Sequence, residues 1–222
     1  TAIGTLNDKL YVAYDHLVWR YAGGLLSWFG AWDGSVVFYN ADVTGGGLNG
    51  EAQPDPVVAM EDHQGRLYML TRLGYLHYTT GAVSLMVWRF DSNVFGISLK
   101  SYDGKLYVTT REWGQDDTLG TAVLYLFTGS SITELKRFGR DSRISEIGGM
   151  KVWGKRLWYG GSSLFGNGYE VNDMNRTGFG VVAYDVVEDS HSLFATQHNV
   201  TNFPDDSGIG QSWLVDDVAF WG

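Results

Sequence analysis

Short apolar segments recur along the whole chain and are separated by polar turns rich in glycine, asparagine and aspartate. Segments of this length that are rich in Val, Leu, Tyr and Trp are typical of β-strands. No long stretch combines the 3.6-residue period of a helix with capping residues. Residues 122–127 are apolar at every position, which indicates a sheet that is covered on both faces. The pattern therefore predicts an all-β fold of buried sheets.

One motif repeats along these strands: a tight polar turn, then a basic residue, then a leucine followed by an aromatic residue. Its leucines lie about 40 to 57 residues apart, at Leu10, Leu67, Leu106 and Leu157. A weaker copy, residues 216–221, ends the chain. Repeats of this size built from β segments are typical of β-propeller blades.

Four strands are expected around each copy of the motif. In the third unit they are predicted at residues 96–102, 105–111, 121–128 and 132–138, and in the fourth at 145–152, 156–160, 180–187 and 192–197. Asp103-Gly104 is a strong hairpin-turn pattern because both residues tolerate a positive φ angle. Gly129, Gly81 and Gly23-Gly24 are expected to serve the same purpose at later turns.

We therefore predict a single β-propeller domain over residues 1–222, built of four-stranded antiparallel blades, with about five blades visible. The blades are expected at residues 1–32, 57–90, 94–139 and 144–199, with a partial blade at 209–222 and an insertion at 33–56. Either strands from the two termini complete one blade, or the chain is a piece of a larger ring. A β-sandwich and a β-helix remain alternatives, although neither explains the recurring turn.

The motif Asp103-Gly104-Lys105-Leu106-Tyr107-Val108 and its copies resemble β-propeller repeat proteins of the kelch-like and short-repeat type. The resemblance covers nearly the whole chain. The chain is free of cysteine and rich in glycine and aromatic residues. In this style it is also similar to propeller domains in virion and tail proteins of bacteriophages. The double glycine of kelch repeats is not repeated faithfully here, so the resemblance implies a fold and no particular activity.

Charge and composition exclude several classes of function. The net charge is −9, and lysine and arginine are scattered along the chain, so nucleic acid is not an expected partner. No apolar run is long enough to span a bilayer. The chain has no cysteine, which excludes thiol chemistry. Its five histidines lack metal-ligand spacing, and no phosphate-binding glycine motif occurs, so neither a metal nor a cofactor is predicted.

Candidate binding residues come from the long connections between strands. In an up-and-down blade the connections after the second and fourth strands leave on one face, and the long segments 33–56, 112–120, 162–178 and 200–208 all follow such strands. Loops on a rigid scaffold commonly carry binding sites. Aromatic rings beside amides and carboxylates suit sugars, because the ring faces contact the apolar side of a pyranose. The predicted ligand-binding residues are Trp113, Asp116, Asp117, Phe165, Tyr169, Asn172, Asp173 and Asn175.

The sequence thus predicts a non-enzymatic structural or recognition module that presents one loop-rich face to a surface glycan or to protein subunits of a larger assembly. The expected location is extracellular or on a virion. The alternative is a carbohydrate-active enzyme, either a glycosidase or a lyase, which needs two or three converging carboxylates. The predicted inner strands supply only Glu61 and Glu146, so no catalytic residue is assigned.

Overall fold

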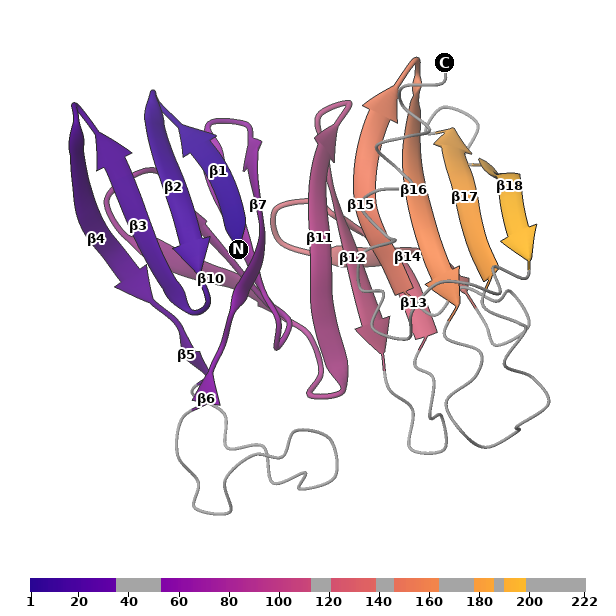
Figure 1. Ribbon diagram of the computed structural model, residues 1–222, viewed down its shortest axis with the longest axis horizontal. Helices are drawn as coiled ribbons and strands as arrows, with labels where there is room; N and C mark the ends of the chain where they lie inside the picture. The colour runs from indigo at the N-terminus through magenta and orange to yellow at the C-terminus, as the bar shows by residue number, and fades with distance from the viewer. Residues whose placement is uncertain (35–52, 113–120, 139–145, 164–177, 186–189, 199–222) are drawn as a thin grey trace. The chain divides into compact units, whose positions relative to one another are not determined.

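The computed structural model describes residues 1–34, 53–112, 121–138, 146–163, 178–185 and 190–198. Within these ranges the regular structure is entirely β, with four antiparallel four-stranded sheets, one two-stranded ribbon and no helix. The chain divides into two compact units, Thr1–Ile97 and Ser98–Gly222, which are described separately (Figure 1). The predicted all-β class is confirmed.

The first unit holds two of the four sheets. Its first sheet contains β1 (Ala2–Leu6), β2 (Lys9–Tyr14), β3 (Leu17–Ala22) and β4 (Leu25–Ala31). Its second sheet contains β7 (Val57–His63), β8 (Arg66–Thr71), β9 (Tyr75–Thr79) and β10 (Ser84–Arg89). A short ribbon of β5 (Asp33–Gly34) and β6 (Gln53–Pro54) lies between them in the chain.

Two further sheets follow. The third sheet contains β11 (Val94–Tyr102), which begins within the first unit, and then β12 (Lys105–Glu112), β13 (Thr121–Phe127) and β14 (Ile132–Phe138). The fourth sheet contains β15 (Glu146–Trp153), β16 (Arg156–Ser163), β17 (Gly178–Asp185) and β18 (Ser190–His198). In every sheet the strands pair with their neighbours in chain order.

The strands of the third and fourth sheets match the predicted ranges closely, and β14 matches both predicted ends. Each predicted repeat therefore forms one antiparallel sheet. The predicted fifth copy at residues 216–221 lies outside the described residues. The single-domain assignment stays a prediction.

Tight turns connect the first two strands of each sheet, as the motif predicts. Asp103 and Gly104 have φ angles of 49° and 70°, and Asn7 and Asp8 have φ angles of 49° and 60°. Two consecutive positive φ values are the geometry of a type I′ turn, whose twist matches that of the flanking strands. The glycines predicted at later turns, Gly23, Gly24, Gly81 and Gly129, also have positive φ.

A β-bulge recurs between the third and fourth strands of all four sheets. In each case the register of the fourth strand skips one apolar residue, namely Phe29, Val87, Leu135 or Phe194. A bulge bends its strand and increases the local twist. Phe29 and Leu135 each pack against the core of their own unit. At Phe29 and Leu135 the bulge thus turns an additional apolar side chain of an outer strand inward.

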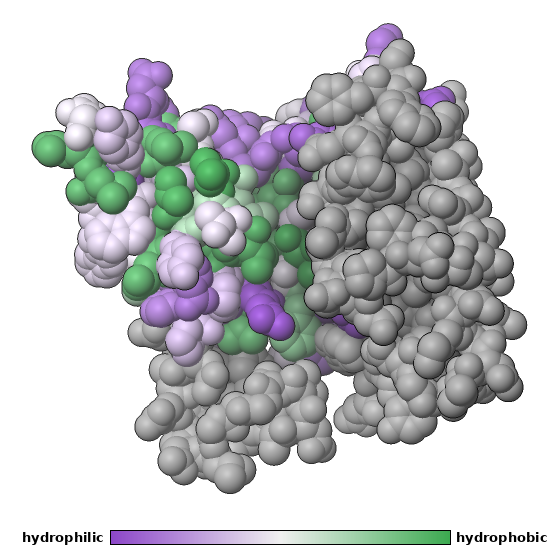
Figure 2. All heavy atoms as spheres, viewed as in Figure 1, coloured by the Kyte–Doolittle hydropathy of each residue, from purple (hydrophilic) through white to green (hydrophobic). Residues whose placement is uncertain are grey.

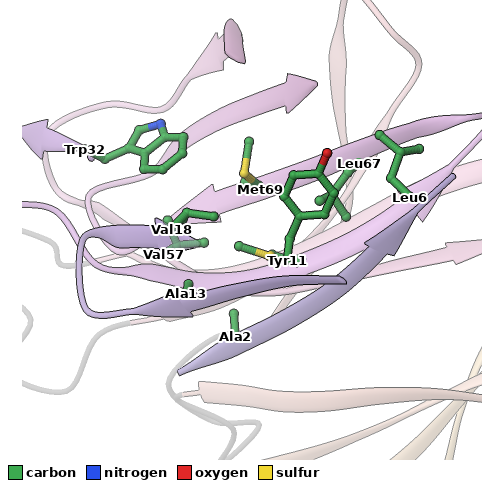
Figure 3. Close-up of a cluster of buried hydrophobic side chains, with 10 residues drawn as sticks. Ala2, Leu6, Tyr11, Ala13, Val18, Trp32, Val57, Leu67 and Met69 are labelled. Atoms are coloured by element: carbon green, nitrogen blue, oxygen red, sulfur yellow. The ribbon is translucent and has the colours of Figure 1, made fainter. Parts of the chain in front are cut away.

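The core of the first unit lies between its two sheets (Figure 3). Tyr11 is fully buried there, with Leu67 and Met69 of the facing sheet in the same cluster. The sheets approach so closely at Gly4 that an added Cβ would lie 2.7 Å from Leu67 Cδ1 and 2.9 Å from Met60 Cβ. This close contact requires glycine at position 4.

The second unit has an equivalent core between the third and fourth sheets. Buried Tyr107 and Leu124 of the third sheet join Met150, Leu157 and Tyr159 of the fourth in one cluster. The first strand of the fourth sheet, β15, contacts both β12 and β13. The same arrangement, with one sheet packed face to face on the next, therefore occurs in both units.

Candidate functional site

The eight predicted ligand-binding residues all lie outside the described part of the chain. Trp113, Asp116 and Asp117 fall in residues 113–120, and Phe165, Tyr169, Asn172, Asp173 and Asn175 fall in residues 164–177. The sugar-binding site therefore stays a prediction. The structure does describe the strands from which both segments start.

These strands are β12 and β16, the second strands of the third and fourth sheets. Figure 1 shows that both end on the same side of the second unit. The meander topology contributes to this arrangement. A two-residue turn reverses the chain before each of these strands, so the connection that follows the strand leaves from the end of the sheet opposite to that turn. Segments 113–120 and 164–177 consequently begin on one side, and the tight turns before β12 and β16 lie on the other.

A cluster of charged and hydroxyl groups lies where segment 113–120 begins. We call Glu112, Tyr125, Glu134 and Arg137 the loop-root cluster. The Tyr125 hydroxyl donates a hydrogen bond to Glu112 Oε1, and Arg137 Nη1 donates to Glu112 Oε2. Arg137 also donates through Nη2 and Nε to the two carboxylate oxygens of Glu134, at 2.7 and 3.1 Å. The cluster thereby joins three neighbouring strands, β12, β13 and β14.

The electrostatics of the loop-root cluster suit anchoring better than proton transfer. Burial, followed by the hydrogen bond to Glu112, raises the pKa of Tyr125 above its usual range. The hydrogen bonds to Glu134 and then Glu112 raise the pKa of Arg137. Tyr125 therefore keeps its proton and Arg137 its charge at neutral pH. The cluster holds Glu112, the last residue before the segment, in one position.

The first unit also contains buried ionisable groups with structural contacts. Asp55 is 2 % exposed, and its Oδ1 accepts a hydrogen bond of 2.8 Å from the Leu73 backbone N–H. Burial raises the pKa of Asp55, and hydrogen bonds from Thr71 and Leu73 oppose this change. Burial also lowers the pKa of His77 to about 4, and its ring lies edge-on to Trp32 with 5.9 Å between centroids.

The two glutamates considered for the enzyme alternative lie in different compact units, Glu61 on β7 and Glu146 at the start of β15. Across the residues that the structure describes, no three His, Asp or Glu side chains gather into a potential metal site. In the same ranges, no helix has the length and apolar character needed to cross a membrane.

Two features were missed by reasoning from the sequence. The loop-root cluster was missed because it joins Glu112 to Arg137, which are 25 residues apart. The other is an uncharged, apolar outer face on the first sheet, whose alternating Tyr14, Trp19, Tyr21 and Trp28 could have indicated it. Neither feature belongs to the predicted sugar site.

Comparisons with known proteins show similarity at the level of the fold. No family model matches the chain, and no curated protein sequence is significantly similar to it. A crystal structure of a protein of unknown function from Dyadobacter fermentans DSM 18053 matches with a TM-score of 0.50 and 14% sequence identity. The match covers 87% of this chain and 63% of that protein, so the chain spans less than two thirds of its structural neighbour.

Proposed function

We propose that the chain is a β-propeller module without enzymatic activity that recognises a surface glycan or a protein subunit through one loop-rich side. The propeller assignment is supported by four successive meander sheets and by apolar cores between facing sheets in each unit. We further propose that its setting is extracellular or on a virion, as the resemblance in style to phage propellers implies.

One observation carries the recognition proposal. The long segments that follow β12 and β16 begin on the same side of the second unit, and the turns before these strands are tight. A rigid sheet scaffold that concentrates long connections on one side is a common basis for binding. The loop-root cluster supports the proposal, because it fixes the strand end from which segment 113–120 starts.

The partner class is favoured by charge and by side-chain chemistry. A net charge of −9 disfavours polyanionic ligands. The aromatic and amide residues in segments 113–120 and 164–177, such as Trp113 and Asn172, suit an uncharged sugar. A glycan is therefore the first partner to test.

A glycan array probed with the full chain tests this proposal. We expect Trp113→Ala and Tyr169→Ala to abolish glycan binding without changing the melting temperature. Trp153→Ala is a matched control, because Trp153 is a 43 % exposed tryptophan beside the tight turn of β15 and β16, and it should bind normally. Retained binding together with a lower melting temperature in the Trp113 and Tyr169 variants would show that these aromatics only stabilise their loops.

A further inference from the structure

Polar side chains enter the space between the first and second sheets where β9 turns into β10. Tyr11 and Arg20 are directly paired on β2 and β3, so their side chains share the face that packs against the second sheet. Thr79 and Ser84 are paired across the hairpin of β9 and β10, and Thr79 also pairs with the core residue Leu67. Figure 2 shows hydrophilic residues along the upper end of the first unit, where these strands turn.

The turn between β9 and β10 brings these side chains together at Gly81. Arg20 Nη1 donates a hydrogen bond of 2.9 Å to the Gly81 carbonyl oxygen, which links the two sheets. The Gly81 N–H donates to Thr79 Oγ1, also at 2.9 Å. A Cβ added at Gly81 would lie 3.7 Å from the Tyr11 hydroxyl oxygen, and beyond its chain neighbours it would meet no other described atom within 4 Å. The glycine therefore leaves a methyl-sized space beside that hydroxyl.

Three buried polar atoms around this turn have no hydrogen-bond partner among the described residues: the Tyr11 hydroxyl, Arg20 Nε and Ser84 Oγ. Tyr11 is fully buried. Buried polar atoms are nearly always hydrogen-bonded, either within the protein or to a bound species. A guanidinium nitrogen can only donate, and both hydroxyls can donate. Three such donors at one turn call for a ligand that accepts hydrogen bonds.

We propose that Tyr11, Arg20 and Ser84 bind a small monovalent anion of the halide class, such as chloride. Charge is the reason for an anion. The Arg20 guanidinium is always ionised, and within the described ranges its side chain contacts the neutral Gly81 carbonyl and no carboxylate. A buried positive group without a counter-charge is costly. A halide supplies that charge and accepts all three hydrogen bonds, whereas a water molecule supplies no charge.

The surroundings of the site restrict the size of the anion. Tyr11 and Thr79 are fully buried, and the hydrogen bond from Arg20 to Gly81 holds the two sheets together beside them. A large organic anion would have to separate the sheets, and a single-atom ion does not. Arg20 is only partly buried, which gives a small ion a route from solvent. An ion held by residues of both sheets stabilises the folded first unit.

Thermal melting of the full chain in sodium chloride and in sodium gluconate, at equal ionic strength, tests this proposal. We expect the melting temperature to rise with chloride concentration, because an ion that binds only the folded state stabilises it. Gluconate is too large for the site and should give no such rise. Arg20→Gln removes the charge and should weaken chloride binding about tenfold or more. Tyr11→Phe and Ser84→Ala each remove one hydroxyl and should weaken it about fivefold; these two variants decide the question if Arg20→Gln does not fold.

The matched control is Arg66→Gln on β8 of the same unit, where the guanidinium lies over the Tyr78 ring at 4.6 Å. It should keep the full response to chloride. Crystals grown in bromide should show an anomalous peak beside the Tyr11 hydroxyl and Arg20. Equal melting temperatures in chloride and gluconate overturn the proposal, even with a bromide peak, which would then reflect binding at crystal concentration only. A chloride response that survives all three site variants also overturns it. The result is independent of glycan binding, because the site contains none of the residues tested on the array.

Discussion

Replacing Gly4 with alanine measures how tightly the first two sheets pack. The new methyl group would lie 2.7 Å from Leu67 Cδ1 and 2.9 Å from Met60 Cβ, both closer than carbon atoms normally approach. Met60 Cβ is fixed to the backbone of the facing strand, so the contact can be relieved only by separating the sheets. Overpacking of this kind costs about 1–3 kcal/mol of unfolding free energy.

A second substitution converts this expectation into a test of mechanism. Leu67 is fully buried, and Leu67→Ala alone should cost about 3–5 kcal/mol through lost contacts and a cavity. In the double variant the methyl group at position 4 occupies part of the space that Leu67 leaves. The two costs should therefore fall short of additivity by about 1–2 kcal/mol. The remaining contact with Met60 keeps the rescue incomplete.

Urea unfolding followed by tryptophan fluorescence provides these free energies, and hydrogen exchange of the β1 and β8 amides confirms that the first unit is affected. Thr5→Ala is the matched control, because the neighbouring residue is exposed on the other face of the same strand. It should change stability by less than about 0.5 kcal/mol. Costs at Gly4 and Leu67 that add within about 0.5 kcal/mol would refute the proposed contact between the sheets.

Three further predictions concern titration, the loop-root cluster and a turn. Burial lowers the pKa of His77 to about 4 in the folded protein from 6.5, so its contribution to stability is present above pH 6.5 and is lost as the pH falls toward 4. The loss should reach about 2 kcal/mol between pH 7 and pH 5, and His77→Phe should remove this part of the pH dependence in thermal melts. Glu112→Ala should lower the free energy of unfolding by about 1–3 kcal/mol, because the buried Tyr125 hydroxyl loses this acceptor. In the same urea assay Arg137→Ala should lower it by less than about 1 kcal/mol, because the Arg137 side chain is 42 % exposed. Gly104→Ala should lower the free energy of unfolding by about 1–2 kcal/mol because φ is 70° there. Steric contact is not the cause, since no atom lies within 4 Å of the added Cβ. An unchanged melting temperature would contradict this reasoning.

The sheets could be predicted from the sequence because their determinants are local. The turn at Asp103-Gly104 defines where β11 ends and β12 begins, and both residues have the positive φ that such a turn requires. The run of apolar residues then identifies β13. Local patterns of this kind determine strand positions and antiparallel pairing within a repeat.

The loop-root cluster depends on information that no local pattern contains. Glu112 and Arg137 belong to strands separated by β13, and their meeting depends on the bulge that skips Leu135 in the register of β14. The bulge moves Arg137 by one position relative to β13. Without it, alternation would place Arg137 on the opposite face of the sheet from Glu112.

The apolar outer face of the first sheet, which carries Tyr14, Trp19, Tyr21 and Trp28, was missed for a different reason. When both faces of a sheet are apolar, as along Tyr11-Val12-Ala13 of β2, alternation no longer tells the covered face from the exposed one. The pattern predicted two covered faces for such strands, and in the first sheet only one of them packs in the core. Which neighbour is present is a property of tertiary structure, and hydrophobicity alone does not report it.

The bulge shared by all four sheets has a consequence for how this protein meets other molecules. An outermost strand with regular pairing offers a row of free amide and carbonyl groups onto which a foreign strand can add. A kink in that strand interrupts the row and twists it away from a straight template. Lateral growth by strand addition is therefore discouraged at the margin formed by the fourth strand of each sheet, which leaves association at that margin to the broad surfaces of the sheets and to the segments between strands.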